Sequence, residues 1–208
     1  MKKAGALALG TALPGAAVAR AGQMAKPEKK KAPFKYCLNT STISGQKPGL
    51  LRYVDIAAGA GYDSLELWIR DIQAYVSQGS SLASLDQHIR DAGLTVENTI
   101  GFAPWMVADA TERATGFKQL EEEMEMLARI GCKRIAAPPA GVKKGQPVDL
   151  LKAGEYYRQA LELGRKTGVM PQLEFWGSSG TVYHLGQALA IAAAANDPDA
   201  RLLPDIYH

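Results

Sequence analysis

The sequence of 208 residues has little cysteine and almost no net charge. Two cysteines are too few for a disulfide scaffold or a four-cysteine zinc site. Three of the 24 basic residues, Lys2, Lys3 and Arg20, lie within the first 20 positions, which leaves 21 to balance the 21 acidic residues. Because the rest of the chain has no basic excess, its composition argues against nucleic acid as the main partner.

Phosphate-binding motifs are also missing. No Gly-x-Gly-x-x-Gly follows the first apolar run that could be a strand, and no Gly-Lys-Ser/Thr loop occurs. A nucleotide-binding fold therefore loses its usual support. The hydrophobic fraction of 47% and the charged fraction of 22% are typical of one soluble globular domain.

The N-terminus has the features of an export signal. Lys2 and Lys3 precede the apolar segment 4–19, which ends in the small residues Ala17-Val18-Ala19. The segment is too short and too often interrupted for a stable membrane span, which needs about 20 apolar residues. We expect an export signal over 1–19 and a periplasmic location, with a cytoplasmic leader as the alternative. Residues 2–10 resemble the part of twin-arginine signals that follows the arginine pair, although the pair itself is absent. Residues 20–33 are expected to form a linker.

Helix-like stretches end four times in glycine, and a short apolar run follows each of them. The glycines are Gly61, Gly93, Gly131 and Gly168, and Asn196 can end a fifth helix in the same way. Six runs are typical of strands: 35–41, 64–69, 94–100, 134–138, 172–176 and 202–207. Strand and helix thus alternate, which indicates βαβ units and a parallel sheet.

The regular alternation of strands and helices, together with the absence of phosphate-binding motifs, favours a (β/α) barrel. Such barrels usually have about 250 residues and eight strands. We therefore expect residues 34–208 to form an incomplete α/β barrel of the TIM type, with about six of the eight βα units. Strands one and six would leave open edges, which a homo-oligomer could cover.

Two carboxylates interrupt the fifth and sixth predicted strands, Glu174 and Asp205. Active sites of such barrels lie at the carboxyl ends of the strands, and neighbouring strands are about 4.8 Å apart, so both side chains could reach one divalent ion. Oxygen ligands suit Mg²⁺ or Mn²⁺, whereas the imidazole of His208 would favour Zn²⁺ or Co²⁺. The alternative is that both carboxylates make structural hydrogen bonds or salt bridges.

Short motifs around these residues resemble the xylose isomerase-like barrels, which include sugar (phosphate) isomerases and epimerases, inosose dehydratases and DNA repair enzymes of the endonuclease IV type. They are Leu-Glu-Phe-Trp-Gly at 173–177, Leu-Pro-Asp-Ile-Tyr-His at 203–208, and the helix-to-strand passages 61–67 and 127–135. The similarity covers residues 34–208. The order and spacing of these motifs resemble those of the family, and the resemblance implies a form of the barrel that is truncated at its C-terminus.

The resemblance implies roles for single residues. Glu174 would be a metal ligand and the acid or base, Asp205 a second ligand, and His208 a ligand to the metal or to the substrate. In that family a further His and Glu from strands seven and eight complete the metal sphere, and neither is present in these 208 residues. The one metal site is therefore expected to be incomplete.

The implied reaction is the transfer of a proton next to the carbonyl of a sugar or sugar phosphate, by an isomerase or epimerase. Two alternatives stay open. One is a dehydratase or lyase that acts on keto-sugars or inososes, and the other is a non-catalytic remnant or sugar-binding domain. The nuclease branch fits poorly, because its zinc cluster needs several histidines and two of the three here, His88 and His184, fall on predicted helices.

Residues near the ends of the strands could line a sugar pocket, in which aromatic rings pack on C–H surfaces. Packing within the barrel core is the alternative for each of them. The candidates for substrate binding are Glu66, Trp68, Asn98, Phe102, Trp105, Trp176 and His208.

Overall fold

The computed structural model describes residues 33–145 and 147–208. Residues 34–208 form one compact unit. The predicted export signal 1–19 and nearly all of the predicted linker 20–33 lie outside the described residues, so both stay predictions. Within the described part of the chain, no helix combines the length and the apolar composition that crossing a membrane requires.

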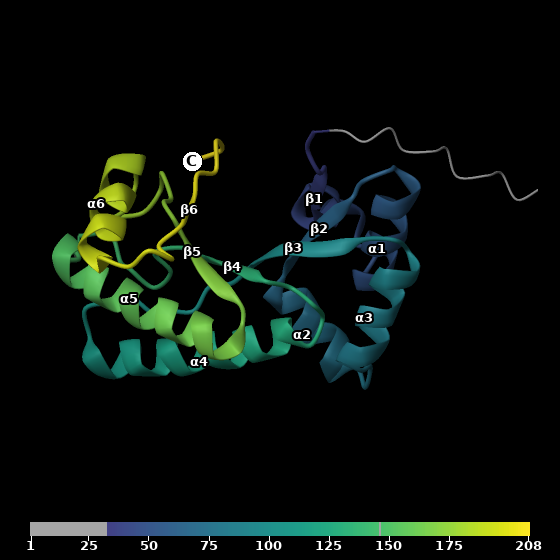
Figure 1. Ribbon diagram of the computed structural model, residues 1–208, viewed down its shortest axis with the longest axis horizontal. Helices are drawn as coiled ribbons and strands as arrows, with labels where there is room; N and C mark the ends of the chain where they lie inside the picture. Colours follow the sequence, from purple (N-terminus) through teal and green to yellow (C-terminus); the bar gives the residue numbers. More distant parts are fainter. Residues whose placement is uncertain (1–32, 146) are drawn as a thin grey trace, which may run out of the picture. The chain divides into compact units, whose positions relative to one another are not determined.

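Six parallel strands form one sheet in the order in which they occur along the chain (Figure 1). The strands are β1 (Cys37–Asn39), β2 (Ser64–Trp68), β3 (Thr95–Ile100), β4 (Arg134–Ala137), β5 (Met170–Glu174) and β6 (Leu202–Leu203). A sheet of this order, in which each strand pairs with the next, is an incomplete barrel of the TIM type. The predicted fold class is confirmed.

Helices connect the strands. They are η1 (Thr40–Gln46), α1 (Leu50–Gly59), α2 (Ile69–Ser77), α3 (Leu82–Asp91), α4 (Ala110–Ala128), α5 (Leu150–Thr167) and α6 (Leu185–Ala195). All five predicted helix stops have a left-handed backbone, with φ of 86° at Gly61, 77° at Gly168 and 48° at Asn196. Asp109 and Asp149 begin α4 and α5 by accepting backbone N–H bonds.

The two faces of the sheet differ in chemistry. On β2 the fully buried Leu65 and Leu67 alternate with the half-buried Glu66 and Trp68, as the period of two in a strand requires. Figure 1 shows α4 and α5 side by side along one face of β4 and β5. The apolar face packs against the helices, which leaves the other face for polar side chains and the site.

Four local predictions need correction. The predicted strand 35–41 is β1 at Cys37–Asn39, because the side chain of Asn39 accepts a hydrogen bond from the N–H of Ser41 and begins η1. Helix α2 was not expected; it begins directly after Trp68 without a side-chain cap, and Ile69 and Ile72 bury one face. The predicted strand 172–176 is β5 at Met170–Glu174, because Gly168 turns the chain so that Met170 already donates to the carbonyl of Lys133. The predicted strand 202–207 ends at Leu203, because Pro204 has no N–H to donate.

Candidate metal centre

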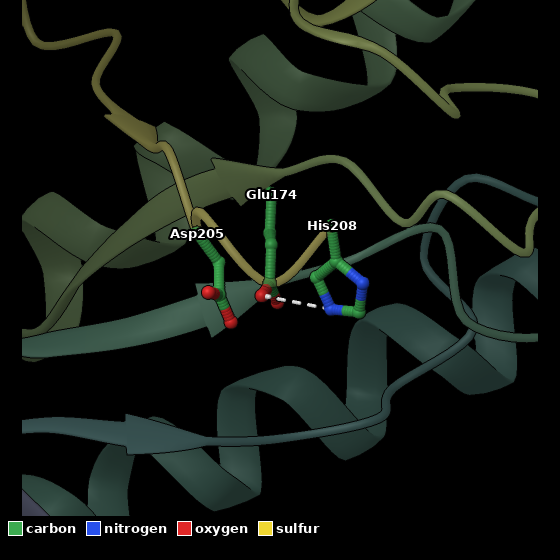
Figure 2. Close-up of side chains that lie close together, drawn as sticks. All are labelled: Glu174, Asp205 and His208. Atoms are coloured by element: carbon green, nitrogen blue, oxygen red, sulfur yellow. Dashed lines mark ion pairs between the residues drawn. The ribbon is translucent and has the colours of Figure 1, made fainter.

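The three predicted metal ligands lie together where β5 and β6 end (Figure 2). Glu174 is the last residue of β5, whereas Asp205 and His208 lie in the segment that follows β6. One potential ligand atom of each residue lies within 4.8 Å of those of the other two. Nε2 of His208 is 3.8 Å from Oε1 of Glu174. The sheet and the segment after it thus bring two carboxylates and one imidazole to one point.

A turn at residues 205–208 brings His208 back toward Glu174. Oδ1 of Asp205 accepts a hydrogen bond from the N–H of Tyr207 at 2.9 Å, and the N–H of His208 donates to the carbonyl of Asp205 at 3.2 Å. This is an Asx turn, in which an aspartate side chain takes the place of a backbone acceptor. Oδ2 of Asp205 accepts no hydrogen bond from the described residues, and that oxygen is available to a cation.

Gly177 allows this turn to come close. A Cβ atom at position 177 would lie 2.8 Å from the carbonyl oxygen of His208, closer than real Cβ contacts. The contact is with the carbonyl group of residue 208, which would have to rotate or shift to make room for a side chain. We expect this displacement to disturb the position of His208 relative to β5.

We therefore expect Gly177→Ala to lower the affinity for Mn²⁺ by about tenfold, an effect typical of residues that orient ligands. The matched control is Gly45→Ala, where the added methyl group meets nothing within 4 Å. Titration of both variants with Mn²⁺ measures the effect. Equal affinities of the two variants would show that the turn does not position His208.

Burial controls the acidity of Glu174, whose side chain is 4% exposed. Loss of hydration is the main cause that raises its pKa from 4.5 to about 7. The indole of Trp176 acts in the opposite direction, and the charges of Asp205 and Glu66 raise the pKa further. Oε2 of Glu174 is buried and accepts no hydrogen bond in the described part of the chain. Such an oxygen needs a proton or a cation.

The donor set fits a divalent ion. Two carboxylates and one imidazole suit Zn²⁺, Mn²⁺ or Co²⁺, and the unpaired Oε2 of Glu174 is a group that such an ion would satisfy. Glu174, Asp205 and His208 would hold it. The other two histidines lie elsewhere: Nε2 of His88 is 2.9 Å from Asp55, and the exposed His184 precedes α6.

Aromatic rings connect this site to the ends of β2 and β3. We call Trp68, Phe102, Trp176 and His208 the aromatic arc. The ring centroids are 5.4 Å apart for Trp68 and Phe102, 5.7 Å for Phe102 and Trp176, and 6.2 Å for Trp176 and His208. Four of the residues predicted to bind substrate are thus neighbours in space, from strands that are far apart in the sequence.

Trp105 does not join this group. Its side chain is fully buried, its ring packs 5.9 Å from that of Tyr157 on α5, and its Nε1 has no partner in the described residues. The segment after β3 places Trp105 in the core, so burial and not pocket lining accounts for its position. Asn39, which sequence reasoning missed, contacts Glu66 and Trp68. The sequence feature that could have identified Asn39 is its position as a polar residue at the end of a short apolar strand.

Comparison with known proteins agrees with this architecture. The family model of the xylose isomerase-like TIM barrel matches residues 54–208, and the chain belongs to that family. Among curated proteins, no sequence matches the chain.

Solved structures show the same fold. An IolI protein with a bound zinc atom has a TM-score of 0.72 at 19% identity, over 81% of this chain and 62% of that one. D-psicose 3-epimerase has a TM-score of 0.68 at 16% identity, over 83% of this chain and 63% of that one. A probable 3-DHS dehydratase from Bacillus anthracis has a TM-score of 0.67 at 19% identity, with the same two coverages. The chain thus spans less than two thirds of the length of these structures.

Proposed function

We propose that the protein is a divalent-metal-dependent isomerase or epimerase that moves a proton next to the carbonyl of a sugar. The observation that carries this proposal is Glu174, a buried carboxylate with an unpaired oxygen and a pKa of about 7, within reach of Asp205 and His208. The epimerase among the similar structures supports it.

Glu174 acts as the base and then as the acid. Burial raises the pKa of Glu174 to about 7 in the metal-free site, and a bound ion would lower it and keep the carboxylate ionised, which is the form that a base requires. A carboxylate oxygen of Glu174 takes the proton from the carbon beside the carbonyl. Its transfer to the neighbouring carbon on the same face, while a hydroxyl proton passes between the two oxygens, gives an isomer. An epimer forms when the first carbon receives a proton on its opposite face from a second donor, such as water, because Glu174 lies on one face only.

The remaining side chains hold the reactants. Asp205 and His208 would hold the ion together with Glu174, and the ion would supply the positive charge that makes the C–H group next to the carbonyl more acidic. Glu66 and Trp176, which both act on the pKa of Glu174, and Trp68 of the aromatic arc would bind the sugar, with His208 as a contact to the ion or the substrate. Aromatic rings provide the apolar surface against which the C–H groups of a sugar pack.

Dehydration is the second candidate, because the probable dehydratase among the similar structures has nearly the same TM-score as the epimerase. The same proton removal by Glu174 would be followed by loss of the neighbouring hydroxyl group as water. A sugar-binding domain without turnover would use the same ion and the same rings.

Incubation of the Mn²⁺-loaded chain with ketoses and inososes in D₂O distinguishes these functions. We expect deuterium at a carbon next to the carbonyl together with a new isomer or epimer, both detected by NMR. An unsaturated product would favour the dehydratase. Binding of sugar without deuterium uptake or product would contradict a catalytic function for the chain.

A further inference from the structure

A row of polar side chains crosses the ends of β1, β2 and β3. Asn39, Glu66 and Asn98 are register neighbours on the three strands, and we call them the amide clamp. Nδ2 of Asn39 donates to Oε2 of Glu66, and Nδ2 of Asn98 donates to Oε1 at 2.8 Å. Two amides thus hold one carboxylate in a fixed position at the centre of the row.

A β-bulge creates this arrangement. The register between β2 and β3 shifts after Leu65, so that Glu66 pairs with Asn98. Without the extra residue Glu66 would lie opposite Glu97, and like charges directly opposite each other destabilise a sheet. Bulges often re-aim side chains beside functional sites. Here the bulge exchanges a repulsive neighbour for a hydrogen-bond donor.

Asn98 keeps one unused acceptor. The residue is 6% exposed, and its Oδ1 is buried without a partner in the described residues. The hydrogen bond from Nδ2 to Glu66 determines which way the amide points, because a rotated amide would direct its oxygen at the carboxylate. A buried acceptor without a donor destabilises the protein, because the acceptor loses its hydrogen bonds to water and gains none in return. A ligand that brings a hydroxyl group would remove this cost.

The aromatic arc links the amide clamp to the metal centre. Nε1 of Trp68 donates to Oδ1 of Asn39 at 3.1 Å, and the ring of Trp68 begins the arc that ends at His208. The charge of Glu66 also acts on Glu174. A single ligand could therefore contact the metal centre at one end and the clamp at the other.

The hydrogen-bonding groups of the clamp indicate which chemical groups the ligand carries at the end that contacts the clamp. The groups of the clamp that can still accept hydrogen bonds are Oδ1 of Asn98 and the carboxylate oxygens of Glu66. Among the described residues, Glu66 forms no ion pair with Lys or Arg. Arg70 lies over the Trp68 ring at 4.2 Å and pairs with Asp71 at 3.7 Å. With Lys47 it also lines a separate cavity of about 450 Å³ between η1, α1 and α2.

We propose that the amide clamp is the subsite for the hydroxyl groups of a neutral, unphosphorylated sugar, held at the end of the ligand away from the metal centre. The proposal rests on the proposed function and narrows its substrate class. Hydroxyl groups donate to Asn98 and Glu66, whereas a phosphate group has too few protons to donate and is repelled by the carboxylate.

The test is calorimetric binding of the neutral ketohexoses, and of the 6-phosphate of each, to the Mn²⁺-loaded chain. The neutral sugar that binds most tightly is expected to bind at least about tenfold more tightly than its phosphate, and inorganic phosphate is expected not to compete with it. Asn98→Leu and Glu66→Gln are each expected to weaken its binding by about tenfold. Glu97→Gln is the matched control, since it removes a carboxylate of β3 outside the clamp, and its sugar affinity should be unchanged.

Melting temperature and Mn²⁺ affinity of every variant show whether the fold and the metal centre are intact. Phosphates that bind as tightly as neutral sugars, or full sugar affinity in both clamp variants, would overturn the proposal. So would Mn²⁺-loaded protein that binds neither class. Failure of the unaltered chain to bind Mn²⁺ would instead overturn the proposed function, so the two failures are distinguishable.

Discussion

Glu174→Gln is expected to lower the affinity for Mn²⁺ by at least about 100-fold, because it replaces a charged ligand by a neutral one in a site with three ligands. Loss of the base should also lower turnover by about 10²–10⁴-fold. Gln has nearly the same shape as Glu, so the buried position can be filled without a cavity. Calorimetric titration with Mn²⁺ and NMR assays of turnover measure the two effects.

Glu123→Gln is the matched control. Glu123 on α4 is also a buried glutamate with an unpaired Oε2, but it hydrogen-bonds to Gln119 and is outside the metal centre. Burial raises its pKa as well. We expect this variant to bind Mn²⁺ like the unaltered chain. Equal losses in both variants would mean that removing any buried carboxylate disturbs the fold and that Glu174 has no special role.

In the metal-free chain, stability is expected to fall as the pH rises from about 4.5 to about 7. The pKa of Glu174 is about 7 in the folded state and near 4.5 in the unfolded state, so the folded state holds the extra proton in this interval. Below the interval both states are protonated; above it the folded state contains a buried, unpaired charge. The difference is about 3 kcal/mol, at about 1.4 kcal/mol per unit of pKa.

Urea denaturation in the presence of a chelator, at several pH values between 4 and 8, measures this effect. Glu174→Gln should lack the decline that Glu174 causes, so the comparison of the two proteins isolates it. Bound Mn²⁺ should add more stability at pH 8 than at pH 5, because binding displaces the proton of Glu174. The same pH dependence in both metal-free proteins would contradict the raised pKa.

Much of the fold could be predicted because local chemistry determines it. Gly61 and Gly168 end helices in conformations that other residues avoid, and the alternation of Leu65, Glu66 and Leu67 already shows two faces of a strand. The prediction that Glu174 and Asp205 bind a metal rests on a similar local signal, since a carboxylate among apolar residues at a strand end has few structural explanations. Helix α2 was missed because it starts without a capping side chain directly at the end of β2.

Contacts between distant residues could not be predicted. Asn98 faces Glu66 only because of a bulge, and nothing in the sequence of β2 or β3 marks where the register shifts. His208 approaches Glu174 because Asp205 forms an Asx turn and Gly177 leaves room for it. Trp105 is an aromatic residue after a strand, as a residue that lines a sugar pocket would be. Only the packing of its ring against Tyr157 shows that it belongs to the core.

The metal content of the purified chain tests the central claim most directly. After incubation with Mn²⁺ and removal of the excess, elemental analysis should find about one ion per chain, and the ion should be absent from Glu174→Gln prepared in the same way. A chain that folds, shows the melting transition expected of its core, and retains no Mn²⁺, Co²⁺ or Zn²⁺ would contradict the account.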